Sequence, residues 1–138
     1  MKPLRLAVLV AVLMMGLSGL AHADRIALVI GNGAYPESPL SNSLNDSKGM
    51  KTALQKLGFQ VIYLENADMV EMDNAVHEFT KLLQPDSEGL FYFSGHGAQA
   101  DGANYVIPLN ASIANKAELK ARAYYAISLN RGLRLRTC

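Results

Sequence analysis

The stretch that most limits the fold is the apolar run Arg25–Gly31, which reads Arg-Ile-Ala-Leu-Val-Ile-Gly. Its inner positions are aliphatic or β-branched, and no polar residue alternates with them. A strand with this pattern is buried on both faces, which is typical of a central strand in a parallel sheet. The run therefore predicts an α/β domain rather than an all-helical or all-β one.

A helix and a second strand are predicted after this run. Ser43-x-x-Asp46 resembles a capping box, with Asp where Glu or Gln is usual. Gly58 is well suited to the position just after the C-terminal end of the helix that this box would begin. The apolar residues that follow predict a strand over 59–64.

A second helix and a third strand complete the alternation. Asp68-x-x-Glu71 marks the start of a helix that Pro85 ends, and the apolar, aromatic run 90–93 reads as a buried strand. The order β-α-β-α-β has crossovers long enough for right-handed parallel connections. We therefore expect a three-layer α/β/α sandwich with a mostly parallel sheet. Farther along, the pattern predicts a short strand over 105–108 and a helix over 117–130.

The strand over 90–93 ends in the loop Ser94-Gly95-His96-Gly97. Ligands of open α/β sheets bind beyond the carboxyl ends of the strands, and an imidazole is well suited to proton transfer near neutral pH. The flanking glycines let a substrate backbone approach closely. His96 is therefore the candidate catalytic residue, and the alternative is an incidental histidine in a tight turn.

The first 23 residues have the three parts of a secretory signal peptide. A basic start contains Lys2 and Arg5, an apolar run follows over 6–20, and Ala21-His22-Ala23 supplies the small residues of a cleavage site. The apolar run is shorter than the ~20 residues of a spanning helix. We expect cleavage near Ala23, a periplasmic or secreted product, and no stable membrane insertion after cleavage.

Composition excludes several classes of function. The formal net charge is +1, so nothing indicates binding to nucleic acid or to an anionic membrane. Gly31-x-Gly33 follows a strand, but the third glycine of a dinucleotide site is missing, and Pro36 prevents a helix from starting at once. The single cysteine, Cys138, allows no internal disulfide.

Several segments together resemble the caspase-like cysteine peptidases, most closely their bacterial metacaspase-like branch. They are the strand 25–32, Leu44-Asn45-Asp46, Leu57-Gly58-Phe59-Gln60-Val61, Asn104-Tyr105-x-Ile107-Pro108, and above all Tyr92-Phe93-Ser94-Gly95-His96-Gly97. The match runs from Arg25 to about residue 130. It implies an endopeptidase with a Cys–His dyad that acts on a protein or peptide substrate.

The resemblance also implies roles for individual residues. His96 would be the general base and acid, and the backbone N–H of Gly97 would bind the oxyanion, although a turn alone also explains this glycine. Asp46 matches a residue that helps to line a pocket for a basic substrate residue; helix capping is its other interpretation. No cofactor motif is readable, and calcium enters only because many metacaspase relatives require it.

The nucleophile is where the chain departs from the family. The family places Asp-x-Cys after the next apolar core strand, whereas Cys138 is preceded by Arg136 and by no strong apolar run. A neighbouring arginine can lower the pKa of a thiol, so Cys138 stays a candidate nucleophile. We expect residues 24–138 to be a partial caspase-like domain that stops before the nucleophile, with little or no activity as written.

Two other classes of function stay open at this stage. One is a non-catalytic, exported module that keeps the fold and uses the His96 crevice only for binding. The other is a serine hydrolase that uses Ser94, but Tyr92 stands where a nucleophile elbow requires its first glycine.

Overall fold

A computed structural model describes residues 24–125 of the chain. The expected signal peptide and Cys138 lie outside these residues. The centre of the fold is a parallel sheet in the order β2-β1-β3, in which β1 (Arg25–Gly31) lies between β2 (Gln60–Glu65) and β3 (Glu88–Ser94). The expected central position of the first strand is thus confirmed.

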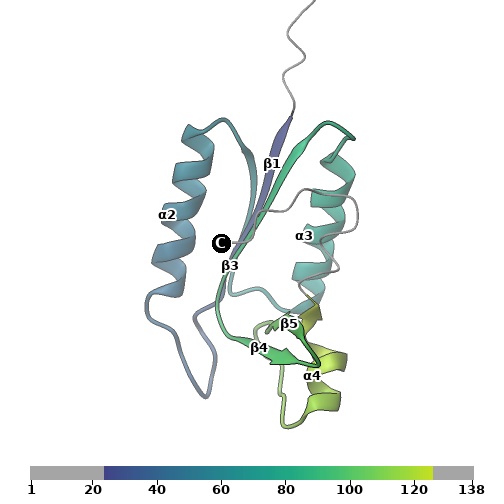
Figure 1. The fold of residues 1–138 in the computed structure, drawn as a ribbon. Helices are drawn as coiled ribbons and strands as arrows, with labels where there is room; N and C mark the ends of the chain where they lie inside the picture. Colours follow the sequence, from purple (N-terminus) through teal and green to yellow (C-terminus); the bar gives the residue numbers. More distant parts are fainter. Residues whose placement is uncertain (1–23, 126–138) are drawn as a thin grey trace, which may run out of the picture.

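Helices cover the two faces of this sheet, as Figure 1 shows with α2 (Ser43–Lys56) and α3 (Met69–Leu82) on opposite sides. Side chains alternate along a strand, so β1 sends Ile26, Leu28 and Ile30 into one core and Ala27 and Val29 into the other. The first core contains α3 residues and the second contains Leu54 of α2. This is the expected three-layer α/β/α sandwich.

The start of α2 differs from the expectation. Asn42 is the N-cap residue, it has helical dihedrals, and its side chain makes no capping hydrogen bond. Ser43 is already inside the helix, and the Asp46 N–H donates to the Asn42 carbonyl at 2.9 Å. The capping box predicted from Ser43 and Asp46 was therefore wrong, because the helix begins one residue earlier than that box requires.

The other end of α2 follows the prediction. Gly58 has φ of +82°, and its N–H donates to the Gln55 carbonyl at 3.1 Å. The N–H of Phe59 donates to the Leu54 carbonyl at 3.0 Å. These two bonds form a Schellman motif, which satisfies carbonyls that the helix itself leaves unpaired.

Helix α3 begins as predicted, with a reciprocal capping box. The Asp68 carboxylate accepts from the Glu71 N–H at 2.9 Å, and the Glu71 carboxylate accepts from the Asp68 N–H at 2.9 Å. The buried face of the helix carries Met72, Ala75 and Phe79. The cap fixes the start of α3, and these side chains hold the helix against β1.

A second, antiparallel sheet follows β3. Its order is β4-β5-β6, with β4 at Gly97–Ala100, β5 at Ala103–Val106 and β6 at Tyr124–Tyr125. The last strand corrects the helix predicted over 117–130, because α4 covers only Lys116–Arg122 and Ala123 is extended. Tyrosine fits a pleated surface well, and the backbone of Tyr124–Tyr125 pairs with β5 instead.

Two asparagines join the carboxyl ends of the parallel strands. Buried Asn32 accepts from the Ala67 N–H at 2.8 Å and donates to the Ala67 carbonyl at 3.0 Å. The Asn66 side chain accepts from the N–H groups of Gly33 and Ala34, each at 2.9 Å. These bonds fix the loop after β1 to the loop after β2, and the loops near His96 are built on this frame. Within residues 24–125, no helix is long and apolar enough to cross a membrane.

Candidate active site

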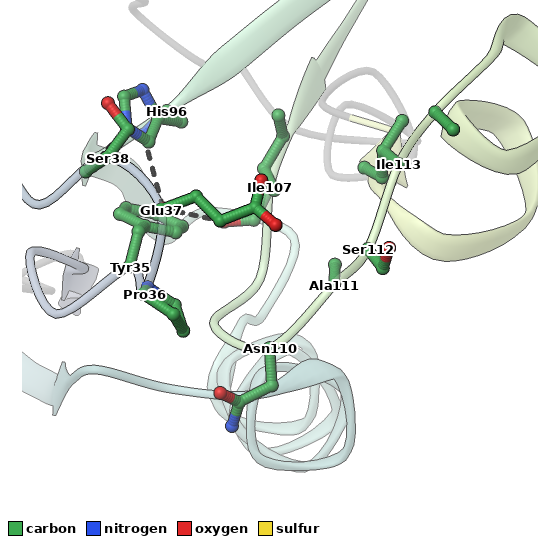
Figure 2. A pocket seen from close by; sticks show the side chains of 11 residues that line it. Tyr35, Pro36, Glu37, Ser38, His96, Ile107, Asn110, Ala111, Ser112 and Ile113 are labelled. Carbon is green, nitrogen blue, oxygen red and sulfur yellow. Dashed lines mark hydrogen bonds between the residues drawn. The ribbon is translucent and has the colours of Figure 1, made fainter.

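Three segments meet in a pocket of about 530 Å³ at the carboxyl ends of the parallel strands. They are the 35–38 segment after β1, His96 after β3, and residue 107 with the 110–114 segment after β5. Figure 2 shows these segments around the pocket. The expected site at the carboxyl edge of the sheet is thus a hollow that contains His96.

The Tyr35 hydroxyl connects the three segments. It accepts from the His96 N–H at 3.2 Å and donates to the Ile107 carbonyl at 2.8 Å. The Ile107 N–H in turn donates to the His96 carbonyl at 2.9 Å. His96 is therefore held through both of its backbone polar groups, and its position is set by contacts from two other loops.

Burial keeps the Tyr35 hydroxyl in its protonated form. Only 8% of the residue is exposed. Desolvation raises the pKa of the Tyr35 phenol above its ordinary value of 10, because burial disfavours the phenolate. The hydroxyl thus stays a donor to the Ile107 carbonyl at every pH at which an imidazole base operates.

Gly95 is required by the close approach of Tyr35. A Cβ atom at this position would lie 2.7 Å from the Tyr35 hydroxyl oxygen and 2.6 Å from Phe93 Cζ. Neither neighbour can withdraw cheaply, because Tyr35 is hydrogen-bonded and Phe93 packs against the core. The glycine before the histidine therefore serves packing as well as turn formation.

The imidazole of His96 is fixed in one tautomer by the loop after β1. Its Nε2 atom lies 2.7 Å from the Ser38 carbonyl oxygen. A carbonyl only accepts, so Nε2 carries the proton and, in the neutral ring, Nδ1 carries the lone pair. The Tyr35 ring lies beside the imidazole, with 4.5 Å between the two ring centroids. This arrangement leaves Nδ1 as the atom that can take a proton.

The backbone N–H of Gly97 takes no part in the hydrogen bonds between β4 and β5. Gly97 is paired with Val106, and the flanking bond runs from the Ile107 N–H to the His96 carbonyl. In an antiparallel ladder this makes Gly97–Val106 a non-hydrogen-bonded pair, so the Gly97 N–H points away from β5. A Cβ atom here would meet the Tyr105 carbonyl at 3.2 Å, a tight but smaller conflict than at Gly95.

The other residues singled out from the sequence lie elsewhere. Asp46 is exposed in the first turn of α2 and does not line the pocket. Ser94 is the last residue of β3 and is also absent from the lining, so the pocket gives a serine nucleophile no support. Cys138 lies outside the described residues.

Sequence reasoning missed two contributors to the site, Tyr35 and the Ser38 carbonyl. Both belong to the loop after β1, which lines the pocket. The role of the Ser38 carbonyl could not be predicted from the sequence, because every residue type has a backbone carbonyl. The one available hint was a tyrosine within a loop rich in proline and serine.

Comparison with known proteins identifies the family. The family described as Caspase domain matches residues 24–133, which is most of the chain. The chain belongs to the caspase domain family. Its fold agrees, since the Drosophila initiator caspase Dronc superimposes with a TM-score of 0.53 at 17% identity, over 70% of this chain and 40% of that one.

Two mammalian proteins are similar in sequence to this caspase domain. The human mucosa-associated lymphoid tissue lymphoma translocation protein 1 is 39% identical over 89 residues, as is its mouse homologue. These residues are 64% of the present chain and 11% of each relative. The aligned part is thus a small share of much longer proteins, and it supports a caspase-like, peptidase-type domain.

Proposed function

We propose that this caspase domain is a cysteine-type endopeptidase in which His96 is the general base and acid of a Cys–His dyad. The observation that supports this role most directly is the bond between His96 Nε2 and the Ser38 carbonyl at 2.7 Å. A dyad histidine needs one fixed nitrogen and one free nitrogen, so that the proton is exchanged at a single defined atom.

His96 and Gly97 suit the proton-transfer and oxyanion steps of acyl transfer, whereas the thiol comes from outside residues 24–125. Nδ1 of His96 would take the thiol proton, and the thiolate sulfur would then bond to the scissile carbonyl carbon. The Gly97 N–H would stabilise the oxyanion. As the C–N bond breaks, Nδ1 would return its proton to the leaving amine, and water would later hydrolyse the thioester. The Ser38 carbonyl would stabilise the imidazolium that exists between these steps.

The nucleophile must come from outside residues 24–125, because the only cysteine in the sequence is Cys138. Arg136 stands two residues before Cys138, at the position where the family has Asp. As the metacaspase resemblance implies, we propose basic residues before the scissile bond, with Asp46 in their recognition, and calcium as the cofactor to test.

The experiment is a peptidase assay of the mature chain on peptides with Arg or Lys before the scissile bond, with and without calcium. We expect little or no turnover from residues 24–138, because a base without a positioned thiolate cannot form the acyl-enzyme. Chains extended through the coding sequence after Cys138, in each frame, should gain turnover where an Asp-x-Cys follows an apolar run. His96→Ala should abolish that turnover.

Two results would change this proposal. Turnover of the printed chain that is lost in both His96→Ala and Cys138→Ala would make Cys138 the nucleophile. Turnover that persists in Cys138→Ala and is lost in His96→Ala would refute the cysteine-peptidase assignment.

We also propose that the protein is exported and acts in the periplasm or outside the cell. The support is the leader pattern of the first 23 residues, which ends in Ala21-His22-Ala23. Expression with its own leader in a bacterium should give a periplasmic product that starts at Asp24. An intact-mass measurement that finds the leader on a soluble cytoplasmic product would contradict this.

A non-catalytic caspase-fold binding module is the second candidate. It is favoured by the lack of any cysteine within residues 24–125, together with a preformed pocket beside His96. This candidate predicts peptide binding that no extension of the chain converts into hydrolysis.

A further inference from the structure

The hydrogen bond that fixes the tautomer of His96 is exposed to solvent. It joins Nε2 to the Ser38 carbonyl at 2.7 Å. Water competes for both groups of an exposed bond, so the bond adds little net free energy unless the carbonyl is already held in place. Ser38 belongs to the 33–40 loop, which follows β1 and contains neither helix nor strand. Whatever holds this loop therefore also determines which nitrogen of His96 carries the proton.

The 33–40 loop is closed at its base. The Leu40 N–H donates to the Gly33 carbonyl at 2.8 Å. A Cβ atom at Gly33 would lie 2.7 Å from the Leu40 carbonyl oxygen, so this closure requires glycine. Pro39 directly follows Ser38, and a residue before proline is restricted to extended backbone, which limits the directions of its carbonyl. The loop is thus a small closed unit, and its position relative to the imidazole depends on what anchors it.

The side chain of Asn66 anchors the loop at its start. Its amide oxygen accepts from the N–H groups of Gly33 and Ala34, each at 2.9 Å. The backbone of Asn66 is itself fixed to β1, because its N–H donates to the Gly31 carbonyl at 2.8 Å. Asn66 has φ of +51°, a left-handed conformation that asparagine adopts more readily than most other residues. One side chain therefore ties the start of the loop to the end of the buried sheet.

We propose that Asn66 is a positioning residue for the candidate catalytic base. By holding the start of the 33–40 loop, it keeps the Ser38 carbonyl at His96 Nε2 and so leaves Nδ1 free to take a proton. This inference rests on the role of His96 in the proposed function. Asn66 does not line the pocket, so it acts through the loop rather than on a ligand. Tyr35 has a different part, because its hydroxyl bonds to the backbone of His96 rather than to the imidazole.

The test is an NMR comparison of the mature chain, residues 24–138, labelled with ¹⁵N in its histidine rings. His77 on α3 is the only other histidine in these residues and gives the reference signals. At about pH 8 a histidine with an ordinary pKa is neutral, and a single tautomer gives two well-separated ring ¹⁵N shifts. Asn66→Gly removes the acceptor and still permits the positive φ. We expect it to bring the two His96 shifts closer together and to make exchange of the Nε2 hydrogen with water about tenfold faster.

Three further variants complete the design. Asn66→Asp keeps an acceptor and tolerates the same φ, and it should restore the native His96 signals. Gly33→Ala disturbs the closure of the loop without changing Asn66, so it should reproduce the effect of Asn66→Gly and provides a second test if that variant does not fold. Ser87→Ala is the matched control. It removes the acceptor of the Gln84 N–H in the turn before β3, at the end of the strand away from His96, and should leave the His96 signals unchanged.

Three results would overturn the positioning role. The first is unchanged His96 signals in folded Asn66→Gly and Gly33→Ala, and the second is no recovery in Asn66→Asp. The third is the same change in Ser87→Ala, because it would then follow from any loss of stability. In an extended chain that hydrolyses peptides, Asn66→Gly should lower kcat about tenfold with little change in KM.

The positioning role and the peptidase proposal can fail separately. Asn66-dependent His96 signals in an extended chain that never hydrolyses a peptide would support the positioning role and refute the peptidase. Hydrolysis by an extended chain whose His96 signals do not depend on Asn66 would do the reverse.

Discussion

The two sheets of this caspase domain are stabilised in different ways. In the parallel sheet, Ala27, Leu28, Val29 and Ile30 of β1 have no exposed surface, and helices cover both faces. In the antiparallel sheet, Gly97, Gln99 and Asn104 are exposed. The parallel sheet is held by apolar burial, which responds weakly to pH and salt, while the antiparallel sheet depends more on surface contacts.

The surface contacts of the antiparallel part centre on Asp101. This residue forms the β4–β5 turn with Gly102, both at positive φ, and its carboxylate pairs with Lys116 and Lys120 of α4. About half of each of these three side chains is exposed. Exposed ion pairs contribute little and are screened by salt. His96 therefore lies at a boundary, with a strand of the helix-covered parallel sheet before it and a more exposed hairpin after it, which we expect to open more easily.

The largest expected effect of a substitution is in the parallel core. Phe79→Ala should lower the free energy of unfolding by about 3–5 kcal/mol, because Phe79 is fully buried between α3 and β1. Val70 on the same helix is 66% exposed, so Val70→Ala should change stability by less than about 0.5 kcal/mol. Urea denaturation measures both. Similar losses of unfolding free energy in the two variants would contradict this account of α3.

An intermediate effect is expected at the boundary between the two parts. Tyr35→Phe removes the hydroxyl that bonds to His96 and Ile107, at a cost of about 1–3 kcal/mol. The ¹⁵N shifts of the His96 ring should also move towards a mixture of tautomers, because the Ser38 bond loses its support. Tyr63→Phe, which removes a hydroxyl bonded to Ser47 and Glu65, is the matched control. Unchanged His96 shifts in Tyr35→Phe would show that Tyr35 does not position the imidazole.

The smallest expected effect is on the stability of the antiparallel sheet at acid pH. It is also the most direct test of the difference between the two sheets. Hydrogen bonds from Lys116 and Lys120 lower the pKa of Asp101 from 3.8 to about 2. A carboxyl with a lowered pKa stabilises the fold above its ordinary pKa, and this contribution is lost as pH falls from about 4 to about 2. The protection factors of β4 and β5 amides against hydrogen exchange should therefore fall over this range, while β1 amides stay protected.

Asp101→Asn should lower the protection factors of β4 and β5 amides at pH 6 and remove the acid dependence of these factors. Asp86→Asn, in the turn before β3, is the control and should leave both properties unchanged. Simultaneous loss of protection in β1 and β4 would show that the two sheets open as one unit.

The same division explains what sequence could predict. The parallel part was readable because uninterrupted apolar runs, the Asp68–Glu71 box and Gly58 all express local rules whose outcome burial then reinforces. His96 was found because its loop follows such a strand. The antiparallel part depends on pairing between distant segments: Tyr124 and Tyr125 lie in a helix-forming stretch, and only the partner strand β5 makes them extended.

Within the site, side-chain chemistry was predictable and backbone chemistry was not. His96 and its flanking glycines could be recognised in the sequence from their residue types. The Ser38 carbonyl and the outward Gly97 N–H are groups that every residue has, and their roles arise from register and loop path. The buried Tyr35 hydroxyl falls between these cases, since its residue type is visible but its partners are sixty or more residues away.

The order β2-β1-β3 has a consequence for how the chain folds during synthesis. Its most apolar strand, β1, leaves the ribosome first, yet it pairs on one side with β3, the last of the three strands to be made. Until Leu90 to Phe93 are available, one edge of β1 has no partner. Long-range parallel pairing of this kind is slow and leaves apolar surface exposed to association. We therefore expect the nascent chain to be prone to association until the strand that leads to His96 has joined the sheet.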